Sequence, residues 1–377
     1  MYTLNGQTRM ETALSPSGAP QLPSVIPYED ICIRDHWTAI TNCAWWAPYD
    51  PDERIQRVWR TDVLSAIPQD WYCLDAHPPV DSLRTVRIEQ RADSVWRVDQ
   101  SGNQVQLIPP SVSGERELRS TLTVSPPCPA SREAVDRLFA SSPQPTEPDV
   151  GQTPQPPRYG ALQDLYADRL PYARINAPLW DCFALWGYER TLMMVHEDSS
   201  LLAYACERYL ERALRTVPQL TAVGARLIWI EDCMTDSISP AAYRTLNLPA
   251  LQTLTRAIEA HGLYSVHYAT GRLTDRWDLV LSSGATALAL EESRKGFVHD
   301  IVEIARRVDG QMALFGNLDA CHDLERASVD DLQAAVARQL EAAQRNRRRF
   351  VMSLGSPVTP GTPIERLHLW RRLAQAH

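Results

Sequence analysis

The stretch Arg226-Leu-Ile-Trp-Ile-Glu-Asp-Cys233 decides the fold class of this chain. It contains four apolar side chains in succession, and β-branched and aromatic residues are among them. Such a run is typical of a strand that is buried on both faces. The polar residues Glu231 and Asp232 follow at once, where the strand would end. A strand of this kind belongs in a parallel sheet that is covered by helices.

Similar apolar runs recur in the second half of the chain, at residues 264–267, 285–290, 312–315 and 350–353. Longer helical patterns separate these runs, and crossover helices between strands imply parallel pairing. A barrel of eight such units takes roughly 250 residues, and the chain has 377. We therefore expect an α/β fold, a (β/α)8 TIM-type barrel with an N-terminal extension.

The composition divides the chain into three expected parts. Residues 1–25 are rich in Ser, Pro and Gly and are expected to form a flexible N-terminus. Residues 26–157 are expected to form an N-terminal extension with helices, a small antiparallel meander between Thr85 and Leu107, and a Pro-rich connection from Pro126 to Pro157. Residues 158–377 are expected to hold the main part of the barrel.

Polar residues follow each of the apolar runs, and the active site of a parallel barrel lies where its strands end. The catalytic candidates offer carboxylates and an imidazole for proton transfer; they are Asp232, His267 and Glu292. The candidates for substrate binding are Glu231, Tyr268, Glu291, Asn317, Asp319 and Ser356. We expect one cavity to be lined by Asp232, His267, Glu292 and Asn317. For each residue the alternative is a helix cap or a solvated loop position.

The charge and hydropathy of the chain exclude several classes of partner. The formal net charge is −8 and Lys and Arg form no long run, so nucleic acid is not an expected partner. No apolar stretch approaches the roughly 18 residues of a membrane span, and the first residues lack the pattern of a secretory leader. Eight Cys without a C-x-x-C pair are expected to be reduced thiols. We expect a cytoplasmic protein that acts on a small molecule, with no membrane partner.

Four segments taken together resemble the uroporphyrinogen decarboxylase superfamily. They are residues 224–240, 266–271, 314–319 and 353–363, the last reading Ser353-Leu-Gly-Ser-Pro-Val-Thr-Pro-Gly-Thr-Pro363. The superfamily includes the decarboxylases of tetrapyrrole synthesis and the methyltransferases that pass methyl groups to or from corrinoid proteins. The resemblance extends from about Arg174 to the C-terminus, and it too implies a TIM-type barrel.

The resemblance also bears on metal binding. The zinc-dependent methyltransferases of the superfamily carry His-x-Cys at one strand end and a further Cys in the loop after the last strand. This chain has His267, but Ala269 and Ser356 occupy the expected cysteine positions. One His does not hold zinc by itself, although Glu231, Asp232 and Glu292 could supply oxygen ligands. We assign no metal ligands. The resemblance then implies that His267 positions substrate or transfers protons, and the alternative is a histidine satisfied within the core.

Three functions remain open. The porphyrinogen decarboxylases hold a polycarboxylate through an Arg-rich segment near the N-terminus, where Arg34 stands alone in Cys32-Ile-Arg-Asp-His36. The loop from Gly355 to Pro363, with Pro360-Gly-Thr-Pro363, is more similar to the methyltransferase branch. The leading hypothesis is a corrinoid-linked or related methyltransferase acting on a small molecule, with a corrinoid on a partner protein as the candidate cofactor. The second is a metal-independent decarboxylase or other lyase. The third is a non-catalytic barrel that binds a tetrapyrrole or a partner protein.

Overall fold

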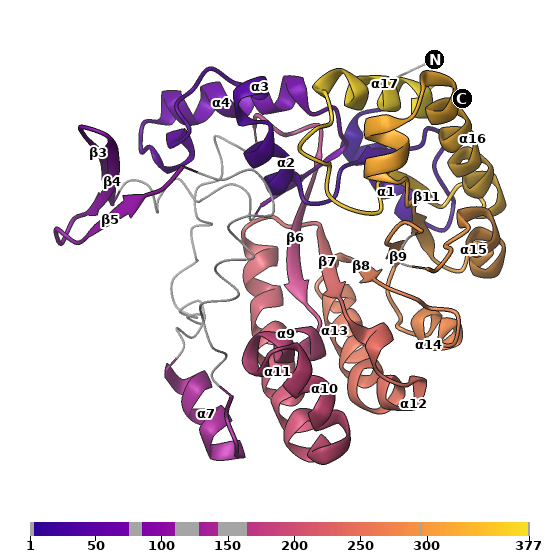
Figure 1. Ribbon diagram of the computed structural model, residues 1–377. Helices are drawn as coiled ribbons and strands as arrows, with labels where there is room; N and C mark the ends of the chain where they lie inside the picture. Colours follow the sequence, from indigo (N-terminus) through magenta and orange to yellow (C-terminus); the bar gives the residue numbers. More distant parts are fainter. Residues whose placement is uncertain (1–3, 75–84, 110–127, 142–163, 294–295, 376–377) are drawn as a thin grey trace.

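The computed structural model describes residues 4–74, 85–109, 128–141, 164–293 and 296–375. Eight of the described strands form one sheet in the order β1-β11-β10-β9-β8-β7-β6-β2. Their bounds are β1 (Ser24–Val25), β2 (Trp71–Cys73), β6 (Leu170–Asn176), β7 (Leu227–Asp232), β8 (Tyr264–Ala269), β9 (Ala287–Leu290), β10 (Ala313–Phe315) and β11 (Phe350–Ser353). Figure 1 shows these strands in the centre of the molecule, with helices around them.

All neighbouring strands of this sheet pair in parallel. The two end strands, β1 and β2, meet without forming a ladder. The backbone N–H of Asp70 donates to the carbonyl oxygen of Ser24 at 2.9 Å, and the indole N–H of Trp71 donates to the carbonyl oxygen of Ile26 at 3.1 Å. The sheet is therefore a nearly closed barrel, which confirms the TIM-type fold expected from the alternating strand and helix patterns.

Helices link the strands and cover the outside of the barrel. After β6 they are α9 (Pro178–Trp186), α10 (Tyr188–Glu197), α11 (Ser199–Ala222), α12 (Pro240–Ala242), the π-helical turn η3 (Tyr243–Asn247), α13 (Leu248–Ala260), α14 (Trp277–Leu281), α15 (Ile301–Val308), the π-helical turn η4 (Ala320–Arg326), α16 (Val329–Arg345) and α17 (Ile364–Gln375). Side chains cap the start of several of them; the hydroxyls of Ser239 and Ser328, for example, accept from backbone N–H groups of the first turn. None of the described helices is long and apolar enough to cross a membrane.

Aromatic side chains fill the interior of the barrel. The rings of Trp71 and Tyr172 stack with centroids 4.1 Å apart, and Trp229 packs against Tyr268 at 4.9 Å. Phe315 contacts Trp71 and Trp229. These rings come from five different strands, so the centre of the barrel is a packed core below the strand ends.

The N-terminus differs from the flexible segment that its composition predicted. Residues 4–25 include α1 (Gly6–Leu14) and β1, and Met10, Ala13 and Leu14 of α1 are at most 1% exposed. The guanidinium of Arg9 binds both carboxylate oxygens of Asp70, at 3.3 and 2.5 Å. Helix α1 is short and contains Gly, Thr and Arg. The apolar periodicity of its buried residues is therefore too weak to recognise from the sequence.

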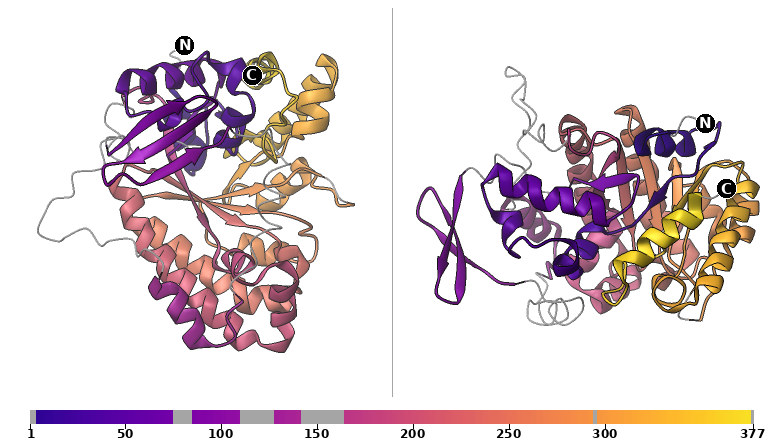
Figure 2. Two further views of the ribbon diagram at one scale, coloured as in Figure 1. Left: turned by 60° about the vertical axis from the view of Figure 1, so that its left-hand side comes forward. Right: turned by 90° about the horizontal axis from the view of Figure 1, so that it is seen from above.

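The rest of the N-terminal third contributes α2 (Glu29–Asp35), α3 (Trp37–Ile40), the short turn η1 (Ala47–Tyr49), α4 (Glu53–Ala66) and barrel strand β2. The expected antiparallel meander is confirmed as β3 (Val86–Arg91), β4 (Ser94–Asp99) and β5 (Gln104–Leu107). Figure 2 shows this small sheet to one side of the barrel. Within the expected Pro-rich connection, α7 (Arg132–Ser141) is described, whereas residues 126–127 and 142–157 lie outside the described residues.

Candidate functional site

A cavity opens at the carboxyl ends of the barrel strands and is called the mouth cavity here. Its volume is about 660 Å³, which lies within the range of cavities that bind small molecules. The described lining residues follow β1, β7, β8, β9 and β11 or lie at the start of α9. They are Tyr28, Trp180, Cys233, Met234, Asp236, Ser237, Tyr268, Thr270, Gly271, Arg272, Glu291, Gly296, Phe297, Ser356 and Pro357.

Two tyrosines from opposite ends of the chain meet at this cavity. Tyr28 lies between β1 and α2, and its backbone adopts the left-handed conformation, with φ 57° and ψ 52°. Its ring meets the ring of Tyr268 edge to face, with centroids 6.1 Å apart. The hydroxyl of Tyr268 donates to the carbonyl oxygen of Gly355 at 2.9 Å, so the loop after β11 fixes this ring.

A buried carboxylate, Glu291, follows β9 directly and is 5% exposed. Its Oε2 accepts a hydrogen bond from the backbone N–H of Gly271 at 3.0 Å. Gly271 has a φ of +78°, and a Cβ at this position would lie 2.2 Å from the carboxylate of Asp236. Glycine is therefore required for this close approach, and the loop after β8 holds Glu291 in place.

The surroundings of the mouth cavity disfavour additional negative charge. Burial, and after it the nearby carboxylate of Glu231, raise the pKa of the Cys233 thiol to about 12. Burial also raises the pKa of the Tyr28 phenol, with Tyr268 and Glu231 contributing in the same direction. Both groups are neutral near pH 7.

The sequence candidates Asp232 and His267 form a pair away from the mouth cavity. The Nε2–H of His267 donates to Oδ2 of Asp232 at 2.9 Å, and both side chains have zero exposed surface. Asp232 also accepts from the hydroxyl of Tyr243 at 3.1 Å and from the amide of Asn247, which is 3.0 Å from each carboxylate oxygen. Tyr243 and Asn247 are the first and last residues of η3. We call these four residues the outer network.

The alternation of side chains along a strand explains this placement. On β7, Trp229 packs among the aromatic rings inside the barrel, whereas Ile228 and Ile230 pack with the helices outside it. Asp232 continues the outer series, and on β8 His267 is the outward neighbour of the inward-facing Tyr268. The expectation that Asp232, His267, Glu292 and Asn317 line one cavity is therefore not met.

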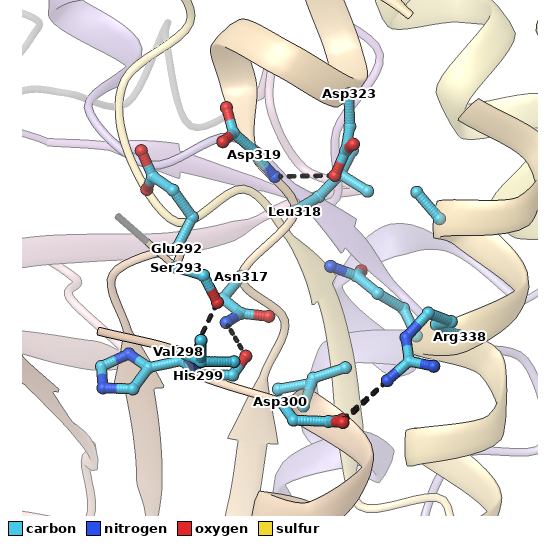
Figure 3. A pocket seen from close by; sticks show the side chains of 13 residues that line it. Glu292, Ser293, Val298, His299, Asp300, Asn317, Leu318, Asp319, Asp323 and Arg338 are labelled. Atoms are coloured by element: carbon cyan, nitrogen blue, oxygen red, sulfur yellow. Dashed lines mark hydrogen bonds and ion pairs between the residues drawn. The ribbon is translucent and has the colours of Figure 1, made fainter. Parts of the chain in front are cut away.

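A second cavity, of about 320 Å³, lies between the ends of β9 and β10 and the helices α15 and α16. Figure 3 shows its lining, in which Asp300 pairs with Arg338 and the amide of Asn317 donates to the carbonyl oxygen of His299 at 3.1 Å. Glu292 and Asp319 also line it. Glu292 reaches toward the mouth cavity as well, because its Oε1 accepts from the hydroxyl of Ser356 at 3.0 Å.

The sequence-predicted residues are thus distributed over three places. Tyr268, Glu291 and Ser356 line the mouth cavity; Glu292, Asn317 and Asp319 line the second cavity; and Asp232 and His267 belong to the outer network. Glu231 is close enough to Tyr28 and Cys233 to raise the pKa of both. Their catalytic and binding roles remain predictions.

Sequence reasoning missed several residues that line the mouth cavity, chiefly Tyr28, Trp180, Cys233 and Phe297. Cys233 directly follows the run that decides the fold, so its place after a strand was a usable signal. Tyr28 follows a strand of only two residues, which is too short to show periodicity. Trp180 and Phe297 carried no recognisable signal.

Comparison with known proteins identifies the family. Residues 173–377 match the family model described as "Uroporphyrinogen decarboxylase (URO-D)". This chain belongs to the URO-D family. The earlier resemblance is thereby confirmed over the second half of the chain.

Curated members of the URO-D family are distant in sequence. A uroporphyrinogen decarboxylase of Xanthomonas euvesicatoria is 28% identical over 192 residues, which are 48% of this chain and 52% of that protein. One of Streptomyces avermitilis is 25% identical over 181 residues, 48% of each chain. The chain spans about half the length of the curated relatives it matches. Among solved structures, a methyltransferase from Methanosarcina mazei shares the fold with a TM-score of 0.62 and 15% identity, covering 99% of both chains.

The donor atoms of this URO-D family member do not fit a zinc site. In the described part of the chain, no three His, Cys, Asp or Glu side chains gather closely enough to hold a metal ion. His267 points to the outer network, and Ser356 donates its hydroxyl hydrogen to Glu292. Ala269 offers no donor atom. We therefore derive no chemical step through a metal.

Proposed function

We propose that this URO-D family member is a methyltransferase that acts on a small molecule bound in the mouth cavity. The observation that carries the proposal is the charge of the lining. Among its described residues Arg272 is the one cation, and Asp236 and Glu291 are carboxylates. A porphyrinogen with many carboxylates would need several cations to replace its hydration. The cavity favours a substrate without that charge.

Two arginines, Arg34 in α2 and Arg174 in β6, add support. Arg34 binds Asp35 with Nε and Oδ1 2.9 Å apart, and Arg174 binds Asp30 at 3.2 Å. Each guanidinium already has a carboxylate partner on the protein, so holding a substrate carboxylate would compete with that pair. Arg34 lies in the segment in which the decarboxylases of the family are expected to hold their substrate.

Three residues of the mouth cavity receive a proposed role. Glu291, fixed by Gly271, holds the substrate or takes up a proton that the methyl acceptor releases. Tyr28 and Tyr268 form apolar walls that orient the substrate and exclude water. A corrinoid on a partner protein would supply or receive the methyl group. Asp232 and His267 touch neither substrate nor cavity in this proposal and instead hold the ends of β7 and β8.

Metal-independent decarboxylation remains the second candidate, because the curated relatives are uroporphyrinogen decarboxylases. The methyltransferase from Methanosarcina mazei is 15% identical and therefore supports the fold alone, not the methyltransferase function. A non-catalytic barrel that binds a tetrapyrrole is the third. The charge of the lining disfavours the decarboxylase candidate. We also propose that the protein acts in the cytoplasm.

Two assays on the purified chain separate these functions. In the first, methylcobalamin is incubated with small thiols and amines, and cob(I)alamin with methylated donors, and the cobalt spectrum reports methyl transfer. In the second, the release of CO₂ from uroporphyrinogen is measured. The proposal predicts transfer without CO₂ release, and loss of transfer in Glu291→Gln but not in Glu303→Gln, a control on the exposed face of α15. CO₂ release without methyl transfer would establish the decarboxylase. Tetrapyrrole binding without either reaction would establish the non-catalytic barrel.

A further inference from the structure

We infer that the mouth cavity binds the alkylated ammonium group of an organic cation, held between the rings of Tyr28 and Tyr268 and the carboxylate of Glu291. This inference rests on the proposed function, because it names the substrate class of the same site. Aromatic faces together with carboxylates are the combination that recognises quaternary ammonium groups.

The aromatic walls come from four separate elements. Tyr28 precedes α2, Trp180 lies in α9, Tyr268 is in β8, and Phe297 follows β9. Tyr28 and Tyr268 meet edge to face, an arrangement that lets the two ring faces point in different directions. A methylated ammonium group has no N–H to donate once it is fully alkylated, so ring faces suit it better than hydrogen-bond acceptors.

The backbone conformation of Tyr28 indicates a functional role for its side chain. Tyr28 is one of the few described residues other than glycine with a positive φ, and the side chain of this N-cap residue makes no capping hydrogen bond. A left-handed conformation is unfavourable for a large side chain and is found preferentially at functional sites. With this backbone conformation Tyr28 lines the mouth cavity.

The local charges favour a cation at this position. The carboxylates of Asp236 and Glu291 line the cavity, and Glu231 lies near Tyr28 and Cys233. The guanidinium of Arg174 already lies over the ring of Tyr28, 5.8 Å from the ring centroid. Asp30 balances the charge of Arg174, and Arg272 has an exposed side chain. The ring of Tyr28 thus already packs against one positively charged group, the guanidinium of Arg174.

The size of the cavity constrains the ligand. About 660 Å³ is more than a trimethylammonium group fills, so the ammonium would be one end of a larger molecule. The polar groups of Ser237, Thr270 and Ser356 line the same cavity and could bind its other end.

The test compares choline with its uncharged isostere 3,3-dimethylbutan-1-ol, each titrated into the full chain by isothermal calorimetry or ligand-observed NMR. Choline is expected to bind at least about tenfold more tightly, the size of a desolvated cation–π interaction. Tyr28→Leu and Glu291→Gln should each weaken choline binding by about tenfold and leave the weak binding of the isostere unchanged. Tyr28→Phe keeps the ring, and Tyr49→Leu removes an exposed tyrosine outside the cavity; both should bind choline as the parent does.

The outcomes separate this inference from the proposed function. Equal affinity for choline and the isostere, or no binding of either, would overturn the inference, and methyl transfer to or from an uncharged substrate would show that the proposed function survives. Selective choline binding in a chain without methyl transfer would retain the inference and reject the function. A melting curve of each variant identifies loss of fold, and Glu291→Gln decides the matter if Tyr28→Leu does not fold.

Discussion

The inner and outer faces of the barrel rim use the same kinds of residue for different purposes. On the inner face, Tyr268 and Glu291 border a cavity that solvent can enter. On the outer face, Asp232 and His267 are fully buried and their bonded partners come from the protein itself. Adjacent residues of one strand, His267 and Tyr268, therefore belong to different environments.

This difference teaches that polarity at a strand end does not by itself identify an active site. The outer network supplies Asp232 with three donors, which is what a buried carboxylate requires. Removing Asp232 leaves its buried donors without their shared acceptor, whereas removing one donor takes a hydrogen bond from a carboxylate that keeps the others. The mouth cavity can tolerate changes to its side chains because solvent is available there.

The first prediction concerns the thiol of Cys233 at the mouth cavity. Because its pKa is raised to about 12, the thiol is neutral at lower pH and little thiolate is present at pH 8. Its alkylation by iodoacetamide at pH 8 should be slower on the order of a thousandfold than in the unfolded chain, where an ordinary thiol pKa of about 8.5 applies. The rate should continue to rise above pH 9. Peptide mass spectrometry measures it, with the exposed Cys128 as control; equally rapid labelling of both would contradict the prediction.

The second prediction is that Asp232→Ala strongly destabilises the fold. The substitution leaves His267, Tyr243 and Asn247 without their shared acceptor, and breaking a buried pair in this way costs roughly 3–5 kcal/mol. Urea denaturation measures the loss. Glu303→Ala breaks an exposed pair with Arg306 and should change the free energy of unfolding by less than about 1 kcal/mol. Similar values for the two variants would show that the outer network carries no stability.

The third prediction is that His267→Ala lowers the free energy of unfolding by roughly 2–3 kcal/mol, because it creates a cavity and removes one donor from Asp232. The imidazole lies outside the mouth cavity, which favours a structural role, and the catalytic role expected from the sequence remains a prediction that this variant tests. Thermal melting checks the change. A parent-like melting temperature together with lost activity would restore the catalytic role.

The smallest expected effect belongs to Ser356→Ala at the boundary of the two cavities. The hydroxyl of Ser356 donates to Glu292 at 3.0 Å, and loss of this bond should lower the free energy of unfolding by about 1 kcal/mol. Denaturant titration of this variant beside Ser101→Ala, an exposed serine in the turn between β4 and β5, gives the comparison. No difference between the two would show that the bond is not formed in solution.

Much of the fold was accessible from the sequence because parallel strands are continuous apolar runs separated by helices. Strands β7 to β11 follow from this pattern, and the antiparallel meander follows from its alternation. Strands β1 and β2 are two and three residues long. So few side chains show no recognisable apolar pattern. The anchored helix α1 was missed for a similar reason.

The site was harder to predict than the fold. In Trp229-Ile-Glu-Asp232 both faces of the strand are apolar before the polar residues begin, because helices cover one face and the barrel core covers the other. The sequence therefore contains no sign of which face is the inner one. Tyr28 is more than 200 residues from its ring partner Tyr268, and their contact depends on the closure of the barrel.

The most direct test of the account is the rate of methyl transfer per folded molecule in His267→Ala and in Glu291→Gln. It is measured at a temperature at which circular dichroism shows both variants folded. The account predicts that His267→Ala keeps a rate close to that of the parent despite its lower stability, whereas Glu291→Gln loses most of the rate and keeps its stability. A folded His267→Ala protein without activity, beside an active Glu291→Gln protein, would contradict the assignment of function to the inner face.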